Sequence, residues 1–321
     1  GYNRTVDQKV NIGSAFLQNE WKNDHWGFLI GGRLDKHNLI DHVIFSPRAN
    51  LRYNPTENIN LRFSYSSGFR APQAFDEDLH VENVGGNVAM VELADNLKEE
   101  RSQSLSASAD IYHRFGAFQV NFLVEGFYTK LSDVFALTDG EVVDGILTRT
   151  RHNASGAQVM GLTLEGKMAY LNKIQVQAGV TLQQSHYSEP HIWNKEAPAV
   201  KKMMRTPNTY GYFTATYTPI KPLSIALSGT YTGSMLVPHE PVPGFLENPI
   251  TVNTKDFFDI GLKAAYDFKL YKSMNLQVNA GVQNIFNAYQ NDFDKGADRD
   301  SGYIYGPSLP RSFFAGVKIS Y

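Results

Sequence analysis

Apolar and polar residues alternate along almost the whole chain. The stretch 174–183 reads Ile-Gln-Val-Gln-Ala-Gly-Val-Thr-Leu-Gln, so its even positions are apolar and its odd positions are Gln, Gly or Thr. Successive side chains of a strand point to opposite faces, which gives this segment one apolar and one polar face. The same period of two recurs, with no helical period between, at 59–69, 118–125, 258–267 and 274–283. The pattern predicts an all-β protein.

We expect thirteen antiparallel strands, and most of them are long. A strand in a soluble protein usually has about five or six residues, whereas about ten residues cross a bilayer at a strand's tilt. Most of the predicted strands reach that second length. They lie at 13–22, 26–35, 46–54, 59–69, 101–113, 117–129, 158–170, 174–186, 207–218, 223–235, 256–269, 274–286 and 310–321.

The predicted connections alternate strictly between short and long. Short turns lie at 23–25, 54–58, 114–116, 171–173, 219–222 and 271–273, and long loops at 36–45, 70–100, 130–157, 187–206, 236–255 and 287–309. Short turns at one end and long loops at the other are typical of an outer-membrane barrel. Aromatic residues also gather near strand ends, as in interfacial belts; they are Trp21, Trp26, Tyr53, Tyr128, Tyr170, Tyr187, Tyr217 and Tyr231.

A soluble β-sandwich or β-propeller would also show alternation and turns. Such folds use shorter strands, however, and rarely keep rows of Gln, Asn, Arg and Glu along an inward face. In a barrel these rows would face water in the lumen. We therefore predict an antiparallel transmembrane β-barrel.

Composition excludes several other classes of protein. No run approaches the ~20 apolar residues of a membrane helix, and mean hydropathy is -0.33. The net charge of -2 provides no overall positive potential that would attract nucleic acid. There is no Cys, hence no disulfide and no thiolate ligand or nucleophile. We find no phosphate loop, no His-Glu-x-x-His and no persuasive Ser-His-Asp order, so we expect neither an enzyme nor a bound cofactor.

The number of strands bears on how much of the barrel is present. If the short turns are periplasmic, the first and last predicted strands both run towards the periplasm. Bacterial single-chain barrels have an even strand number with both termini in the periplasm, and unpaired strand edges in lipid are costly. We therefore expect residues 1–12 to end an extracellular loop, and residues 1–321 to be the C-terminal portion of a larger barrel.

The box Phe69-Arg70-Ala71-Pro72 resembles a signature of TonB-dependent outer-membrane receptors. A second box of the type Asn-Pro-(Asn/Asp)-Leu-Lys-Pro-Glu normally follows it. Here 95–102 takes its place, with Asn96, Leu97, Lys98 and Glu100 as matches and both prolines absent. The segments 159–165, 282–287 and 310–321 are similar to a strand start, a strand end and the last strand of the family. The resemblance covers 13–321.

The resemblance implies an N-terminal plug followed by a barrel of about 22 strands, of which these would be the last thirteen. The plug, the early strands and the TonB-contacting box would lie upstream. The implied function is energised uptake of a scarce nutrient, such as a ferric siderophore, cobalamin or haem. The implied partners are the plug, TonB, outer-membrane lipid, the chelate and, as a further candidate, a surface lipoprotein. The alternatives are a passive porin-like channel and a surface-binding barrel without transport.

The two boxes are also the candidates for contact with the plug. Arg70 ends its strand on the polar face, and we expect it to anchor a loop or the plug through an ion pair or a bidentate hydrogen bond. Direct contact with the ligand is the alternative. Phe69, Ala71, Pro72, Asn96 and Leu97 complete this motif.

The loop 187–206 is the strongest candidate for substrate contact. Its aromatic and basic groups suit an anionic, ring-bearing metal chelate, although a solvated loop could carry the same residues. The candidates are His186, His191, Trp193, Lys201 and Arg205, with His239 as a weaker one. His80 lies between the two boxes, where haem receptors of the family place an essential His; the alternative is an ordinary loop residue.

One loop has carboxylates at a spacing similar to that of calcium loops. The weak metal candidates are Asp292, Asp294, Asp298 and Asp300. The segment lacks the Gly and terminal Glu of an EF-hand, and Lys295 and Arg299 could neutralise the carboxylates instead. A solvated loop is the simpler interpretation.

Overall fold

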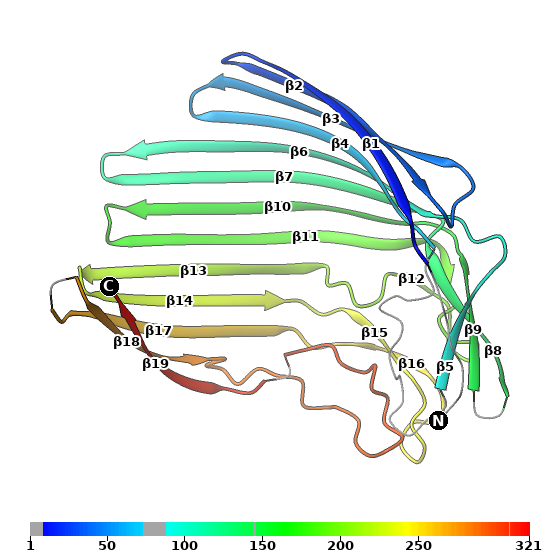
Figure 1. The fold of residues 1–321 in the computed structure, drawn as a ribbon. Helices are drawn as coiled ribbons and strands as arrows, with labels where there is room; N and C mark the ends of the chain where they lie inside the picture. The colour runs from blue at the N-terminus through cyan, green and yellow to red at the C-terminus, as the bar shows by residue number, and fades with distance from the viewer. Residues whose placement is uncertain (1–8, 73–87, 144–145, 272, 308) are drawn as a thin grey trace.

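The computed structural model describes residues 9–72, 88–143, 146–271, 273–307 and 309–321. Thirteen strands form one curved antiparallel sheet in which each strand pairs with its neighbour along the path (Figure 1). They are β1 (Ile12–Lys22), β2 (Trp26–His37), β3 (Val43–Thr56), β4 (Ile59–Arg70), β6 (Glu100–Phe115), β7 (Phe118–Ser132), β10 (Ala157–Tyr170), β11 (Ile174–His191), β13 (Thr209–Ile220), β14 (Leu223–Thr232), β17 (Phe257–Lys269), β18 (Asn275–Gln283) and β19 (Ser312–Ser320).

The thirteen predicted strands correspond one to one with these strands, so the all-β antiparallel prediction is confirmed. The main differences lie at the loop end. β3 begins at Val43 rather than at residue 46, and β11 continues to His191 rather than ending at residue 186. Also at the loop end, Asn284 has a positive φ of 51°, and β18 ends at Gln283 rather than at residue 286.

Local sequence explains the short turns. Between β1 and β2 the side-chain oxygen of Asn23 accepts hydrogen bonds from the backbone N–H groups of His25 (3.0 Å) and Trp26 (2.7 Å), an Asx turn. Between β6 and β7 the left-handed position (φ 57°) is Gly116, which adopts it without a Cβ penalty. The short turns lie together at one end of the sheet and the long connections at the other (Figure 1).

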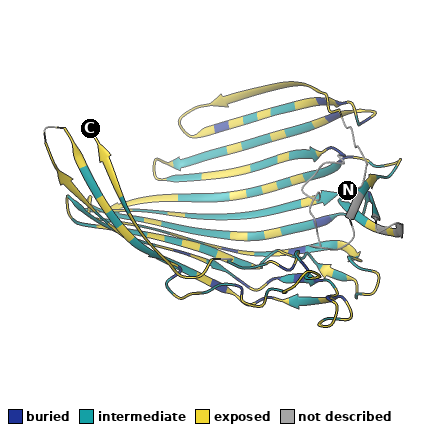
Figure 2. Ribbon diagram, turned by 60° about the horizontal axis from the view of Figure 1, so that its bottom comes forward, coloured by how far each residue is buried: buried dark blue, intermediate teal, exposed yellow. Residues whose placement is uncertain are grey.

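The two faces of the sheet differ in chemistry. On one face, large apolar side chains stand exposed in register, for example Leu162 opposite Leu182. On the concave face polar groups pair across strands and along them. Thr163 and Thr181 lie 3.0 Å apart between their hydroxyl oxygens, and Lys167 Nζ lies 2.7 Å from Glu165 Oε1. Figure 2 shows how little of the sheet is buried.

The buried apolar side chains gather at the loop end of the sheet. One cluster comprises Ile40, Ile44 and Ala71, with Phe69 packed against it. A second comprises Met235, Val237 and Tyr303. Since the middle of the sheet has no such cluster among the described residues, its apolar face needs an apolar environment outside the protein.

Aromatic rings pack together at the short-turn end, as the sequence predicts. Trp26 stacks on Tyr53 with ring centroids 4.2 Å apart. Phe118 and Tyr170 follow at 4.5 Å, and Trp21 lies 5.7 Å from Phe28. Their positions at strand ends are those of an interfacial aromatic belt.

Four of the segments predicted as loops contain strands, which corrects the sequence analysis. β5 (Val88–Leu93), β8 (Phe135–Val143) and β9 (Ile146–Asn153) form a separate three-stranded sheet, in which β5 and β9 are parallel. β15 (Leu236–His239) pairs with β16 (Ile250–Asn253), and β12 (Val200–Lys202) pairs with β11. The parallel pair of β5 and β9 joins segments more than 50 residues apart, whereas β8 and β9 form a local hairpin in which Val143 pairs with Ile146.

The main sheet is open. Its path ends at β1 and at β19, and these two strands do not pair with each other. No helix among the described residues is long and apolar enough to cross a membrane.

Adjacent positions on β6 test the assignment of the two faces. Ala107 is exposed on the apolar face, and Ser108 lies on the polar face opposite Arg62 and Glu125. In the full-length protein in lipid vesicles, Ala107→Arg should lower the free energy of unfolding by about 2–4 kcal/mol, and Ser108→Arg by much less. Denaturant unfolding measures both. Equal losses would show that the two faces are wrongly assigned.

Candidate functional site

The candidate residues lie at the loop end of the sheet, in three groups. The first lies where β4 ends and β6 begins, the second on and beyond the end of β11, and the third between β15 and the 287–309 loop. His80 falls outside the described residues.

The two sequence boxes meet in the first group. Arg70 and Glu100 are register partners, and Arg70 Nη1 lies 4.0 Å from Glu100 Oε2. The guanidinium carbon of Arg70 also lies 5.3 Å from the centre of the Phe135 ring, at the start of β8. Phe69 packs on the Ile40 cluster, and Ala71 and Pro72 are buried. The first box thus joins the main sheet to the small sheet.

Asn153, at the end of β9, holds the second box from the other side. Its side-chain oxygen accepts a hydrogen bond from Lys98 N (2.8 Å), and its nitrogen donates to Lys98 O (3.0 Å) and to Asp133 O (2.8 Å). Leu97 donates from its backbone to Ala94 O (3.1 Å). Asn96 is exposed in the turn between them.

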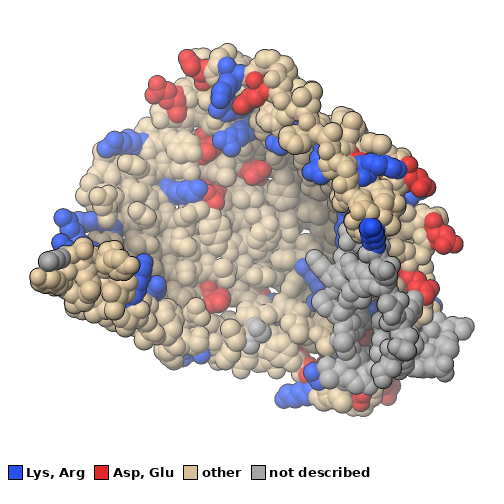
Figure 3. All heavy atoms as spheres, in the orientation of Figure 1, with Lys and Arg blue, Asp and Glu red and all other residues tan. Residues whose placement is uncertain are grey.

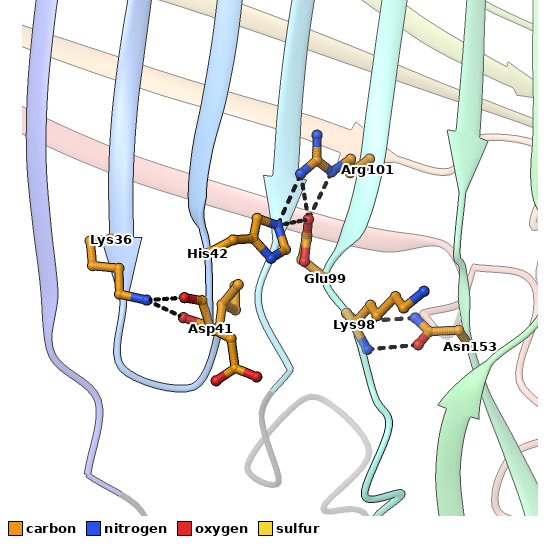
Figure 4. A network of polar contacts seen from close by, with 8 residues as sticks. Lys36, Asp41, His42, Lys98, Glu99, Arg101 and Asn153 are labelled. Atoms are coloured by element: carbon orange, nitrogen blue, oxygen red, sulfur yellow. Dashed lines mark hydrogen bonds and ion pairs between the residues drawn. The ribbon is translucent and has the colours of Figure 1, made fainter.

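The buried side chain of Glu99 is the centre of an ionic network (Figure 4). Its Oε1 lies 2.6 Å from Arg101 Nη2 and 3.0 Å from His42 Nε2, and the side chain is 4% exposed. Burial alone would raise the pKa of Glu99, but hydrogen bonds from Arg101, its own backbone N–H and His42 outweigh it, so the pKa lies below its ordinary value. The Glu99 Oε2 atom is buried without a hydrogen bond. The pairs with His42 and Arg101 keep this carboxylate ionised.

The second group surrounds a register shift in β11 between His186 and His191. His191 is half-buried, with its ring 4.7 Å from Tyr187. Burial, and then the nearby His152, lower the pKa of His191. Trp193 is half-buried with its indole N–H unpaired, and Lys201 is exposed on β12. Of these side chains, Lys201 is the one most open to solvent.

Arg205 belongs to the third group, because its guanidinium is engaged within the protein. Nη1 donates to Ile304 O (2.9 Å) and Nη2 to Gly302 O (2.5 Å). Desolvation lowers the pKa of Arg205, and the charge of Asp300 opposes this shift. The hydrogen bonds tie the 187–206 loop to the 287–309 loop.

His239 and two of the four weak metal candidates converge in the same group. His239 Nε2 lies 2.9 Å from Asp294 Oδ2, and one ligand atom each of His239, Asp294 and Asp300 lie within 4.8 Å of one another. Asp292 instead accepts hydrogen bonds from the hydroxyl groups of Tyr303 (3.3 Å) and Tyr305 (2.5 Å). Asp298 is exposed.

Charge on the concave side is mixed in sign. Figure 3 looks into the hollow of the sheet, where acidic and basic side chains are interspersed among uncharged ones. One hollow of about 220 Å³ on this face is lined in part by Glu20, Arg52 and Arg62. A larger hollow of about 880 Å³ is lined mainly from the apolar face, by Leu105, Leu162 and their neighbours. Neither hollow is lined by a candidate ligand residue.

Sequence analysis missed most of the groups that hold this region together. His42, Phe135, Asn153 and Tyr303 carry no motif of their own. Their partners lie far away in sequence: Glu99 is 57 residues from His42, and Asn153 is 55 residues from Lys98. A local pattern could not have found them, although Glu99 did lie within a recognised box.

Comparison with known protein families identifies the family of this chain. The sequence model of the family described as TonB dependent receptor-like, β-barrel, matches residues 1–285. The chain belongs to this family. The resemblance to TonB-dependent receptors found in the sequence is therefore confirmed. A comparison with curated protein sequences gives no match.

Several solved structures of other proteins share the fold. A ferric enterobactin receptor of Pseudomonas aeruginosa, in a mutant form, is 18% identical with a TM-score of 0.68, covering 98% of this chain and 45% of that one. The siderophore receptor PirA of Acinetobacter baumannii is 15% identical (TM-score 0.67; 96% and 45% covered). The FrpB iron transporter of Neisseria meningitidis is 18% identical (TM-score 0.66; 96% and 45% covered). The chain thus spans less than half the length of these proteins.

Asn153→Ala tests the connection between the small sheet and the main sheet. The substitution removes three exposed hydrogen bonds to the backbone of Lys98 and Asp133, and each lost bond costs about 0.5–1.5 kcal/mol locally. We expect faster amide hydrogen exchange at 97–100 and 133–135, measured by mass spectrometry. The exposed Asn96→Ala is the control and should leave exchange at 133–135 unchanged. Unchanged exchange in Asn153→Ala would contradict the connection.

Proposed function

We propose that this chain is the C-terminal wall and outer mouth of an outer-membrane receptor that imports a metal chelate, such as a ferric siderophore, by TonB-dependent transport. The observation that carries this proposal is the sheet itself. One face is apolar and exposed, the concave face is polar, and the long connections all lie at one end. A wall between lipid and a wet lumen needs this arrangement.

Three further observations support the proposal. The chain belongs to the TonB-dependent receptor family. Proteins of the same fold are described as a ferric enterobactin receptor, a siderophore receptor and an iron transporter. At the mouth, Trp193, His191 and Lys201 offer aromatic surface and positive charge, which attract an anionic chelate with aromatic rings.

The two open edges of the sheet suggest which other parts the receptor has. The unpaired backbone of β1 and β19 would be costly in lipid, so we infer that further strands pair with both and close the barrel at about 22 strands. A plug within the lumen would face the polar rows and provide the connection to TonB. In this proposal the chain contributes binding surface and no catalysis.

Uptake measurements test this function directly. A strain lacking the full-length receptor should lose accumulation of one class of iron chelate, and re-expression should restore it. Restored uptake should disappear when TonB is deleted or the proton gradient is collapsed. Uptake that persists under both treatments would favour a passive channel and would contradict energised transport.

Lys201→Glu tests the contribution of charge at the mouth. Reversing this exposed charge should weaken binding of an anionic chelate by about tenfold, equivalent to about 1.4 kcal/mol, with a smaller effect at high salt. Lys221→Glu, exposed at the opposite end of the sheet, is the matched control and should bind like the unmodified receptor. Isothermal titration of the purified full-length receptor measures both. Equal affinities of the two variants would exclude Lys201 from the binding surface.

Arg70→Glu tests the junction between the two boxes. The substitution places two carboxylates where Arg70 and Glu100 now lie 4.0 Å apart, so we expect a loss of about 1 kcal/mol in stability and less folded receptor in the membrane. The double variant Arg70→Glu/Glu100→Arg restores opposite charges and should recover part of the loss. Heat-modifiable gel mobility measures the folded fraction. If the double variant has no larger folded fraction than Arg70→Glu, the Arg70–Glu100 pair does not stabilise the junction.

A further inference from the structure

The third group contains a cluster of three potential metal ligands from two connections. His239 ends β15, and Asp294 and Asp300 belong to the 287–309 loop, more than 50 residues later in the chain. One ligand atom from each lies within 4.8 Å of the other two. Their side chains are almost fully buried: His239 is 7% and Asp294 4% exposed, and residue Asp300 is 8% exposed.

The surroundings hold these three side chains in place. The His239 ring stacks on Tyr303 with centroids 3.7 Å apart and planes at 7°. The two oxygens of Asp300 accept hydrogen bonds from the backbone N–H groups of Gly302 (2.8 Å) and Glu240 (2.9 Å). Asp294 Oδ2 accepts from His239 Nε2 and from Asp300 N (3.2 Å). Such outer hydrogen bonds orient carboxylate and imidazole ligands in metal sites.

The buried charge of this region is negative when His239 is neutral. Two buried carboxylates, Asp294 and Asp300, lie near one guanidinium, that of Arg205, whose donors bind the Gly302 and Ile304 carbonyls. Buried carboxylates are normally paired or coordinate a metal. The imidazole, when neutral, does not balance them.

We propose that His239 Nε2, Asp294 and Asp300 bind a divalent transition-metal ion, for which Zn²⁺ is the best match. The ion would replace the proton now shared between His239 Nε2 and Asp294 Oδ2, and water would complete the coordination shell. One imidazole and two carboxylates suit zinc and its neighbours in the first transition row. Calcium prefers six to eight oxygen ligands and seldom uses imidazole.

The metal would cross-link the long connections at the loop end of the sheet. It would join the β15–β16 hairpin to the 287–309 loop, to which Arg205 already ties the 187–206 loop. Three long connections would then move as one unit. This role is structural and does not depend on what the receptor transports.

Zinc binding by the metal-stripped full-length receptor tests the site. After desalting, elemental analysis should find one tightly held Zn²⁺, and Co²⁺ used as a probe should give the visible absorption of a coordinated ion. Asp294→Asn and Asp300→Asn, which keep size and shape, should each weaken zinc binding by about 10- to 100-fold or more. His239→Ala should do the same. Asp298→Asn, an exposed residue of the same loop, is the matched control and should bind zinc like the unmodified receptor.

Proteolysis provides a second readout that requires no assumption about transport. Trypsin sites at Lys295 and Arg299 lie within the 287–309 loop that the metal would hold. Zn²⁺ should therefore slow cleavage there in the unmodified receptor and in Asp298→Asn, but not in Asp294→Asn. Gel mobility shows whether each variant is folded. The proposal is overturned if the folded, unmodified receptor holds no zinc, if it prefers calcium, or if His239→Ala and Asp294→Asn bind zinc as tightly as Asp298→Asn.

Discussion

The structure depends on one constraint: a long antiparallel sheet satisfies its backbone hydrogen bonds, but it has no protein core for its apolar face. Thirteen strands pair in sequence order, so almost every strand donates and accepts on both sides. The apolar face, with Leu105, Leu162 and Leu182 exposed, has no layer packed over it among the described residues. Burying side chains of this size is worth about 1.5–3 kcal/mol each, so only an apolar medium makes such a face stable. The bilayer takes the place of the core.

Order at the loop end has a different physical origin. There the chain leaves the hydrogen-bonded sheet and must satisfy its polar groups by other means. Asn153 binds the backbone of Lys98 and Asp133, Glu99 holds His42 and Arg101, and Arg205 binds two carbonyls of a distant loop. Two small apolar clusters support these polar networks. The connections are therefore held in defined positions. A surface that selects a ligand needs such fixed positions.

The candidate site divides between residues that the sequence could identify and residues that it could not. Arg70 was recognised from its box, and the structure places it beside Glu100 of the second box. Arg205 was named as a candidate for substrate contact because of its charge, and the structure adds that its donors bind the carbonyls of Gly302 and Ile304. Asp298 and Asp300 looked equivalent in the sequence, but one is exposed and the other buried. A residue's type is visible in the sequence, whereas its hydrogen-bond partners depend on how distant segments pack.

The sequence by itself determined the class of fold, the number and order of the strands in the main sheet, and which faces of those strands are apolar and polar. These follow from a period of two and from pairing between neighbours, both of which are local in the chain. Only the tertiary structure decided that β9 runs parallel to β5, that His239 meets Asp294 and Asp300, and that Asn153 holds the second box. Those contacts join segments tens of residues apart, and their geometry is set when the loops fold over the end of the sheet.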